Sequence, residues 1–195
     1  MLRDKSLQFA KKRAILAFGG NLSSAIGSPE QTIVAALDIL GTHHIDVTAC
    51  SRFYITPCFP KGMGPDYVNS VAVVETILPP EDLLFELNEI EEKFERAREV
   101  RWAGRTLDID ILSYENCIMP NLDTYSHWKN LPLKTQQEMA PEQLILPHPR
   151  IEDRGFVLIP LCDVWPSWKH PVSGKTAQML CDALPASEIK GIKPL

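Results

Sequence analysis

The sequence has no long apolar run, and no stretch approaches the roughly 20 apolar residues that a membrane-spanning helix needs. Residues 1–13 carry too many charges to contain the apolar region of a signal peptide. The five cysteines are odd in number and include no Cys-x-x-Cys pair, which argues against both a disulfide framework and a zinc knuckle. We therefore expect a protein of a reducing, cytoplasmic compartment.

Basic residues are not in excess either. The chain has 20 Lys and Arg against 25 Asp and Glu, so it lacks the overall positive charge of a general nucleic-acid-binding protein. It contains no internal repeat and no low-complexity tract. A length of 195 residues with 45% apolar and 23% charged residues suits one ordinary globular domain, which we expect to span residues 1–195.

The most informative segment is residues 101–110, which read Arg-Trp-Ala-Gly-Arg-Thr-Leu-Asp-Ile-Asp. Its end alternates like a strand, in which successive side chains point to opposite faces. Asp108 and Asp110 would share one face, and Leu107, Ile109 and Ile111 the other. Two neighbouring carboxylates favour a cation between them. Mg²⁺ is commonly held by one or two carboxylates together with substrate phosphates.

Cationic residues gather just before this strand, although the chain as a whole is acidic. Between positions 93 and 105, the acids Glu95 and Glu99 stand against five cations: Lys93, Arg96, Arg98, Arg101 and Arg105. A solvated helix face with i,i+4 ion pairs would explain Arg96 and Arg98, but not the last two arginines, which lie beyond the expected helix. Arginines suit phosphate oxygens, so the inferred ligand is a Mg²⁺-nucleotide. The alternative for the two aspartates is the polar face of an edge strand.

Periodicity, prolines and glycines divide the rest of the chain into strands, helices and loops. We expect a tight turn at residues 19–22, and a helix capped by Ser28 that ends at Gly41. Residues 56–65 predict a long loop, and residues 119–143 an extended connection without periodicity. The expected strands are 14–18, 45–54 and 66–76, and the other expected helices follow Pro80 and cover 152–161 and 175–183.

Four blocks of the sequence, taken together and in this order, resemble the 6-hydroxymethyl-7,8-dihydropterin pyrophosphokinase family of folate biosynthesis. The similarity covers roughly residues 14–175. The blocks are Phe-Gly-Gly-Asn-Leu at 18–22, Tyr-Ile-Thr-Pro at 54–57 with Gly-Pro-Asp-Tyr-Val-Asn at 64–69, the segment 101–112, and Leu-Pro-His-Pro at 146–149 with Arg-Gly-Phe-Val-Leu-Ile-Pro-Leu at 154–161.

The resemblance implies an α+β fold, a ferredoxin-like α/β/α sandwich with a mostly antiparallel sheet. It implies an enzyme that transfers pyrophosphate from ATP to the hydroxymethyl group of 6-hydroxymethyl-7,8-dihydropterin and releases AMP. The expected cofactor is Mg²⁺, as two ions, and the expected partners are ATP and a reduced pterin. We expect a monomer that binds neither nucleic acid nor a membrane.

The resemblance also implies roles for individual residues. Asp108 and Asp110 are similar to the ligands of the Mg²⁺ ions and, together with Arg101 and Arg105, to the catalytic residues, while Trp102 is similar to a lid residue. The residues similar to nucleotide contacts are Glu91, Arg96, Arg98, Arg101, Arg105, Ile111, His148 and Arg154. Those similar to the pterin pocket are Thr56, Pro57, Phe59, Tyr67, Asn69 and Phe156.

The chain departs from the family's pattern at several points. Trp102 is followed by Ala-Gly where members usually have Gly-Pro, and Gln143 stands where many carry an arginine that contacts the nucleotide. Glu95 replaces a common glycine, and Pro149 follows His148 where some members have tyrosine. The connection at 119–143 is longer than in compact members. We expect this connection to alter access to the adenine or to form a partner surface.

The same residues suit this chemistry without the resemblance, because phosphoryl-type transfer needs positioning and charge neutralisation more than a protein nucleophile. One alternative is a catalytically weak regulatory module that binds a nucleotide and a pterin. It would tolerate the loss of an aspartate or of Asn69, and both aspartates and Asn69 are present. Another is a Mg²⁺-dependent Asp-x-Asp glycosyl transferase, which would need a longer chain. Formation of AMP separates the three.

Overall fold

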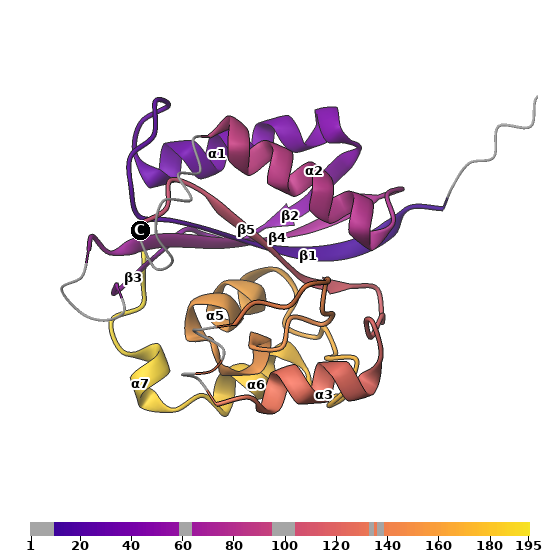
Figure 1. The fold of residues 1–195 in the computed structure, drawn as a ribbon. Helices are drawn as coiled ribbons and strands as arrows, with labels where there is room; N and C mark the ends of the chain where they lie inside the picture. Colours follow the sequence, from indigo (N-terminus) through magenta and orange to yellow (C-terminus); the bar gives the residue numbers. More distant parts are fainter. Residues whose placement is uncertain (1–9, 59–63, 95–103, 133–134, 136–138) are drawn as a thin grey trace, which may run out of the picture.

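The computed structural model of the protein describes residues 10–58, 64–94, 104–132, 135 and 139–195. In this part of the chain a sheet lies between two layers of helices (Figure 1). The strands are β1 (Lys12–Gly20), β2 (Ile45–Cys50), β3 (Tyr54–Thr56), β4 (Tyr67–Thr76), β5 (Asp108–Tyr114) and β6 (Lys193–Pro194). The α-helices are α1 (Pro29–Ile39), α2 (Pro80–Lys93), α3 (Leu122–Asn130), α5 (Gly155–Val164), α6 (Ala177–Asp182) and α7 (Ala186–Ile189), and two 3₁₀ helices are η1 (Leu40–His43) and η2 (Ile151–Asp153).

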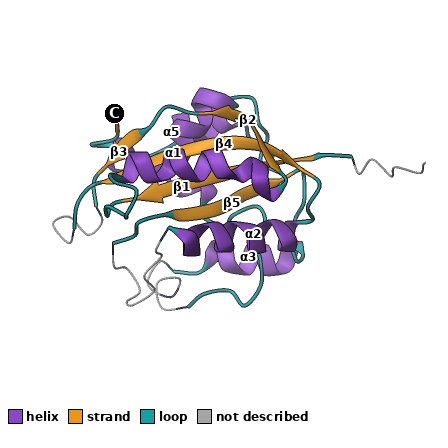
Figure 2. Cartoon of the chain, turned by 90° about the horizontal axis from the view of Figure 1, so that it is seen from above, coloured by secondary structure: helices purple, strands orange, loops and turns teal. Residues whose placement is uncertain are grey.

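The sheet has the strand order β5-β1-β4-β3-β6, and β2 also pairs with β4. Every pairing between these strands is antiparallel. Helices α1 and α2 cover one face of the sheet, while α3, α5, α6 and α7 lie on the other (Figure 1). Seen from above, β5 forms the edge next to α2 (Figure 2). The predicted α+β sandwich with a mostly antiparallel sheet is confirmed.

Side-chain alternation along β1 builds one core on each face of the sheet. Ala14, Leu16 and Phe18 belong to the core under α1 and α2, whereas Ile15 belongs to the core under α5 and α6. The pairing of β1 with β5 shifts register between Ile15 and Leu16. The two-sided burial explains why this strand reads as a continuous apolar run.

The first helix begins as expected and ends differently. Ser28 and Gln31 form the predicted capping box at the start of α1. The prediction that Gly41 ends the helix was wrong, because the chain continues through Gly41 as η1. The left-handed residue that follows η1 is His44, with φ of 61°.

The prediction of a tight turn at residues 19–22 was also wrong, because β1 continues through Gly20. Gly19 is required for a close approach instead. A Cβ on Gly19 would lie 2.9 Å from Oδ1 of Asn69 on the neighbouring strand β4. The expected strand 45–54 is two strands, β2 and β3, separated by residues 51–53.

The connection at 119–143 contains a helix that the sequence analysis missed. Asn121 caps α3 by accepting a hydrogen bond from the backbone N–H of Thr124 at 2.9 Å. Tyr125 is the buried residue of this helix, so there is no repeated apolar stripe to detect. The backbones of Met119 and Leu146 exchange two hydrogen bonds, at 2.8 and 3.1 Å. The chain therefore leaves and returns at one place, and we call residues 120–145 the α3 excursion.

None of the helices among the described residues is both long enough and apolar enough to cross a membrane.

Candidate active site

The two aspartates lie at the start of β5, on the face of the sheet that α5 covers. Asp108 and Asp110 alternate with Ile109 and Ile111, which are buried in the opposite core with Leu107. Leu112, two residues beyond Asp110, lies in the core under α5. The predicted division of this strand into an acidic and an apolar face is confirmed.

A row of directly paired residues crosses the sheet at this point. Asp108 on β5 pairs with Gly19 on β1, Gly19 pairs with Asn69 on β4, and Asn69 pairs with Tyr54 on β3. Directly opposed residues in a sheet point to the same face. Because Gly19 has no side chain, the Asn69 carboxamide can lie over the backbone on this face, with its Oδ1 2.9 Å from where a Cβ of Gly19 would stand.

Cationic side chains flank both aspartates. Nη1 of Arg105 forms an ion pair with Oδ1 of Asp108. Nη1 of Arg154, at the start of α5, lies 3.6 Å from Oδ2 of Asp110, and Nε2 of His148 lies 4.0 Å from the same oxygen. The structure therefore brings together Asp108, Asp110, Arg105, His148 and Arg154, five of the residues predicted from the sequence.

His148 is held in its neutral form. Burial, and then the charge of Arg154, lower the pKa of His148 to about 3. Its Nδ1 accepts a hydrogen bond from the backbone N–H of Arg150 at 3.0 Å. A neutral imidazole carries one N–H, so the proton lies on Nε2, the nitrogen nearest Asp110. His148 can thus donate to an oxygen in the site without adding charge.

Asn21 links the two loops that border the site. Its Oδ1 accepts from the backbone N–H of Arg105 at 2.8 Å, and its Nδ2 donates to the carbonyl of Pro65 at 3.1 Å. The backbone N–H groups of Asn21 and Leu22 both donate to the Arg105 carbonyl. Asn21 is 5% exposed. Sequence reasoning missed this role because Gly-Gly-Asn indicated a turn.

Of the residues predicted for the pterin pocket, Thr56, Tyr67 and Asn69 lie in or beside this row. Tyr67 and Asn69 share a face of β4, as expected from their spacing. Nδ2 of Asn69 donates to Oγ1 of Thr56 at 2.7 Å, and both residues are buried. Pro57 is exposed. Burial raises the pKa of Tyr67, against the opposing charge of Arg105.

Phe156 lies in the first turn of α5 and is partly buried against the core under that helix. The guanidinium carbon of Arg154 lies 5.5 Å from the centre of its ring. This contact is within the range of a cation–π interaction, so Phe156 helps to hold Arg154.

Two predicted nucleotide contacts lie on the other side of the sheet from the aspartates. Glu91, on α2, is 1% exposed, and its Oε1 accepts from the backbone N–H of Ile109 at 2.6 Å. Ile111 is buried in the core under α1 and α2. Their contact with a nucleotide stays a prediction. The remaining predicted site residues lie outside the described residues: Phe59, Arg96, Arg98, Arg101 and Trp102.

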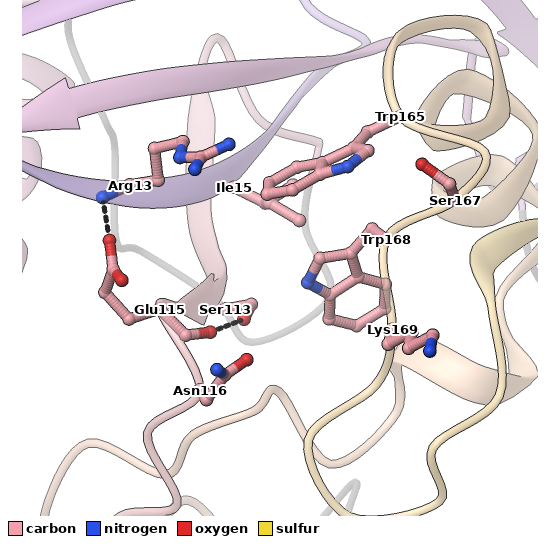
Figure 3. A pocket seen from close by; sticks show the side chains of 9 residues that line it. All are labelled: Arg13, Ile15, Ser113, Glu115, Asn116, Trp165, Ser167, Trp168 and Lys169. Carbon is pink, nitrogen blue, oxygen red and sulfur yellow. Dashed lines mark hydrogen bonds between the residues drawn. The ribbon is translucent and has the colours of Figure 1, made fainter.

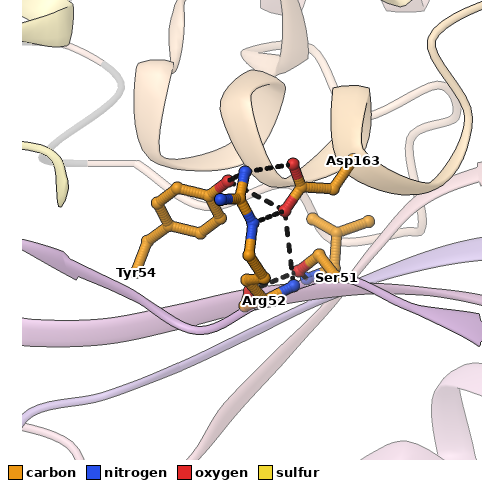
Figure 4. A network of polar contacts seen from close by, with 5 residues as sticks. Ser51, Arg52, Tyr54 and Asp163 are labelled. Atoms are coloured by element: carbon orange, nitrogen blue, oxygen red, sulfur yellow. Dashed lines mark hydrogen bonds and ion pairs between the residues drawn. The ribbon is translucent and has the colours of Figure 1, made fainter. Parts of the chain in front are cut away.

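The far end of α5 is tied to the sheet by the network in Figure 4. Nε and Nη2 of Arg52 donate to the two carboxylate oxygens of Asp163 at 3.0 and 2.8 Å, and the Tyr54 hydroxyl donates to the same carboxylate at 2.8 Å. The hydrogen bond from Arg52 is the main cause of a lowered pKa at Asp163. This network orients the helix that presents Arg154 and Phe156.

The α3 excursion is attached close to the same residues. Lys129 of α3 forms an ion pair with Glu152, two residues before Arg154. Burial alone would raise the pKa of Glu152, but hydrogen bonds from Lys129 and Ser173 lower it. Tyr125, one turn earlier on α3, contacts Nε2 of the buried His170 at 3.3 Å. No signal in a single sequence links these distant positions.

The donor set fits a divalent cation held jointly with a substrate. In the described part of the chain, no three His, Cys, Asp or Glu residues converge as a complete metal site. Asp108 and Asp110 supply two hard oxygen donors on one face, and Asp108 pairs with a glycine, Gly19. Mg²⁺ is usually held by such a pair, with phosphate oxygens and waters completing its six positions.

Comparison with known proteins agrees with this arrangement. A 2-amino-4-hydroxy-6-hydroxymethyldihydropteridine pyrophosphokinase of Synechocystis sp. is 29% identical over 93% of this chain and 80% of its own length. A Pseudomonas aeruginosa protein of the same name is 32% identical over 94% of this chain and 97% of its own length.

A solved structure shares the fold. The wild-type HPPK-DHPS of Plasmodium falciparum superposes on 91% of this chain with a TM-score of 0.62 and 17% sequence identity. The chain spans only 42% of that solved chain. The family model of 7,8-dihydro-6-hydroxymethylpterin-pyrophosphokinase matches residues 15–166. The chain therefore belongs to the 7,8-dihydro-6-hydroxymethylpterin-pyrophosphokinase family.

Proposed function

We propose that the protein transfers the β,γ-pyrophosphoryl group of ATP to the hydroxymethyl oxygen of 6-hydroxymethyl-7,8-dihydropterin and releases AMP. One observation carries the assignment of the site. Asp108 and Asp110 lie on one sheet face, and the absence of a side chain at Gly19, which pairs with Asp108, leaves room for the buried Asn69 carboxamide beside them. A phosphate-bearing substrate and a flat polar one can therefore meet on this face, near Gly19.

Asp108 and Asp110 would hold Mg²⁺, as two ions if the chain follows the family it belongs to, and each carboxylate lies beside an arginine. When bound, Mg²⁺ would neutralise phosphate charge and lower the pKa of the attacking hydroxyl. Arg105 and Arg154 lie near the carboxylates. In the complex we assign these arginines to the phosphate oxygens, where they offset the charge of the pyrophosphoryl group and of the departing AMP.

His148 has a complementary role in this proposal. Its neutral Nε2–H would donate a hydrogen bond to a phosphate oxygen. Because the ring is uncharged, it does not compete with Mg²⁺ for the neighbouring Asp110 carboxylate. The ring cannot serve as a general acid near neutral pH, because its lowered pKa leaves it unprotonated. Its contribution is therefore positioning and hydrogen bonding.

The pterin would lie on the other side of Gly19 from Asp108. Tyr67 and Phe156 supply aromatic faces for a flat bicycle, and Asn69 can both donate and accept at its edge. Thr56 fixes the Asn69 carboxamide through the 2.7 Å hydrogen bond. The Thr56–Asn69 hydrogen bond would therefore hold the Asn69 carboxamide in one orientation before the pterin binds.

The test is incubation with ATP, Mg²⁺ and 6-hydroxymethyl-7,8-dihydropterin, with all nucleotide and pterin products resolved. We expect one AMP and one pterin diphosphate for each ATP consumed. Formation of ADP instead of AMP would show that the protein transfers a single phosphoryl group and not a pyrophosphoryl group. Tight binding of both substrates without AMP would identify a regulatory module.

A further inference from the structure

A second pocket lies at the end of β1 and β5 remote from the aspartates. It has a volume of about 210 Å³, and its floor includes Ile15 and Ser113, which pair across the two strands. Gly19, opposite Asp108, is four residues further along β1, roughly 13 Å away at the usual rise of a strand. Trp165 and Trp168 form its other wall (Figure 3).

Trp168 presents an unused hydrogen-bond donor to this pocket. The residue is 4% exposed, and its ring packs edge-on against His170 with centres 5.7 Å apart. Its indole nitrogen faces the pocket in Figure 3 and makes no hydrogen bond to the other described residues. An indole N–H that opens onto a pocket can donate to an acceptor supplied by a ligand.

Arg13 presents a charge with no acidic partner. Its guanidinium carbon lies 5.2 Å from the centre of the Trp165 ring, and within the described ranges no carboxylate lies at ion-pair distance from it. The one acid of the pocket, Glu115, instead accepts from the backbone N–H of Arg13 at 2.5 Å. Lys169 adds a second cation to the lining. Two cations against one acid make the pocket locally positive in a chain of net charge −5.

We propose that this pocket binds a small aromatic carboxylate. Arg13 and Lys169 attract the anionic group, the Trp168 N–H supplies a hydrogen bond, and Ile15 and the two indoles contact the ring. A phosphate would use more cations or backbone N–H groups than the lining offers, and it would leave the apolar walls uncovered. This site is separate from the proposed catalytic one and does not depend on it.

The indole N–H resonances of ¹⁵N-labelled protein test the proposal directly. The chain has four tryptophans, so the Trp168 signal can be assigned from the backbone and followed during titration with benzoate. We expect a saturable shift of this signal. Arg13→Gln should weaken benzoate binding about tenfold or more, as expected for loss of a charge-assisted contact. Lys12→Gln is the matched control, because Lys12 is an exposed neighbour on the other face of β1.

Further probes define the chemistry. Benzamide, which is similar in size but neutral, should bind far more weakly than benzoate, and so should inorganic phosphate. The proposal is overturned if benzoate leaves the Trp168 signal unmoved, if Arg13→Gln binds benzoate like the unmodified protein, or if benzamide or phosphate binds as well as benzoate. AMP formation by Arg13→Gln should be unchanged, which confirms that the variant is folded.

Discussion

The side-chain oxygen of Asn21 accepts a hydrogen bond from the backbone N–H of Arg105 at 2.8 Å. The nitrogen of the same carboxamide donates to the Pro65 carbonyl, two residues before Tyr67. One buried side chain thus joins the backbone of the proposed phosphate-binding arginine to the loop that leads to Tyr67, a proposed pterin contact. We therefore expect both substrates to sense a change at this position.

Asn21→Ala should lower kcat/KM for ATP and for the pterin, because it removes the hydrogen bonds that hold the Arg105 N–H and the Pro65 carbonyl. The free energy of unfolding should fall by about 1 kcal/mol, the usual net contribution of a hydrogen bond. Asn21→Asp separates the two links, since it keeps the acceptor for Arg105 but loses the donor to Pro65. Steady-state kinetics decide the matter: if Asn21→Asp harms ATP use more than pterin use, the assignment of the two links is incorrect.

Asn69→Ala should weaken pterin binding and leave ATP binding nearly unchanged. A pterin edge that loses its hydrogen bonds to the Asn69 carboxamide costs roughly 1–3 kcal/mol of binding free energy. Thr56→Val should act in the same direction but less, because it only frees the Asn69 carboxamide from its 2.7 Å hydrogen bond. Calorimetric titration of each variant with the pterin and with a non-hydrolysable ATP analogue provides the measurement. An equal loss for both ligands would place the pterin pocket elsewhere.

The ion pair between Lys129 and Glu152 predicts that the α3 excursion supports the nucleotide side of the site. Lys129→Glu and Glu152→Lys should each raise KM for ATP several-fold while the KM for the pterin stays constant, since Glu152 lies two residues before Arg154. The double variant restores opposite charges and should recover most of the loss. Single variants that fold normally and keep an unchanged KM for ATP would show that the excursion has no such role.

Folding stability should depend on pH through the buried His170. Burial lowers the pKa of this ring, and its Nδ1 accepts from the backbone N–H groups of Val172 and Ser173. The unfolded chain takes up the proton near a pKa of about 6.5, whereas the folded state takes it up only at a lower pH. The stabilisation is therefore complete above pH 6.5 and is lost as pH falls below it, by up to about 1.4 kcal/mol per pH unit.

Urea denaturation between about pH 7.5 and 5, the range in which a histidine titrates, measures this slope. His148, whose pKa is also lowered, contributes in the same direction. His170→Asn keeps a side-chain acceptor for the turn and removes the titration, so its slope should be flatter. An identical slope in this variant would show that His170 does not cause the pH dependence of stability.

The elements with strong periodicity could be predicted from the sequence. The α2 stripe of Leu83, Leu87 and Ile90 is fully buried, and the alternation in β5 placed both aspartates on one face. The resemblance to the family also depended in part on the β5 segment. What local pattern cannot reveal is partnership between distant residues, so the Asn21, Arg52–Asp163 and Lys129–Glu152 contacts were not predicted.

The errors have the same origin. Gly19 indicated a turn because a glycine needed for conformation and one needed for space look alike in sequence; the nearby Asn69 oxygen distinguishes them. Helix α3 has one buried residue, Tyr125, so its stability depends on tertiary contact with His170 rather than on an amphipathic stripe. Its existence could only be seen once the fold brought residues 125 and 170 together.

The rate of AMP formation in Asp108→Asn and Asp110→Asn, at saturating Mg²⁺, tests the central claim most directly. The fold uses the opposite face of β5, so both variants should fold while their rates fall on the order of 10³-fold or more, as when a key electrostatic stabiliser is removed. Asp38→Asn, an exposed aspartate on α1, is the control and should keep the normal rate. Near-normal rates in both site variants would contradict the assignment of these two carboxylates as the metal-binding centre of pyrophosphoryl transfer.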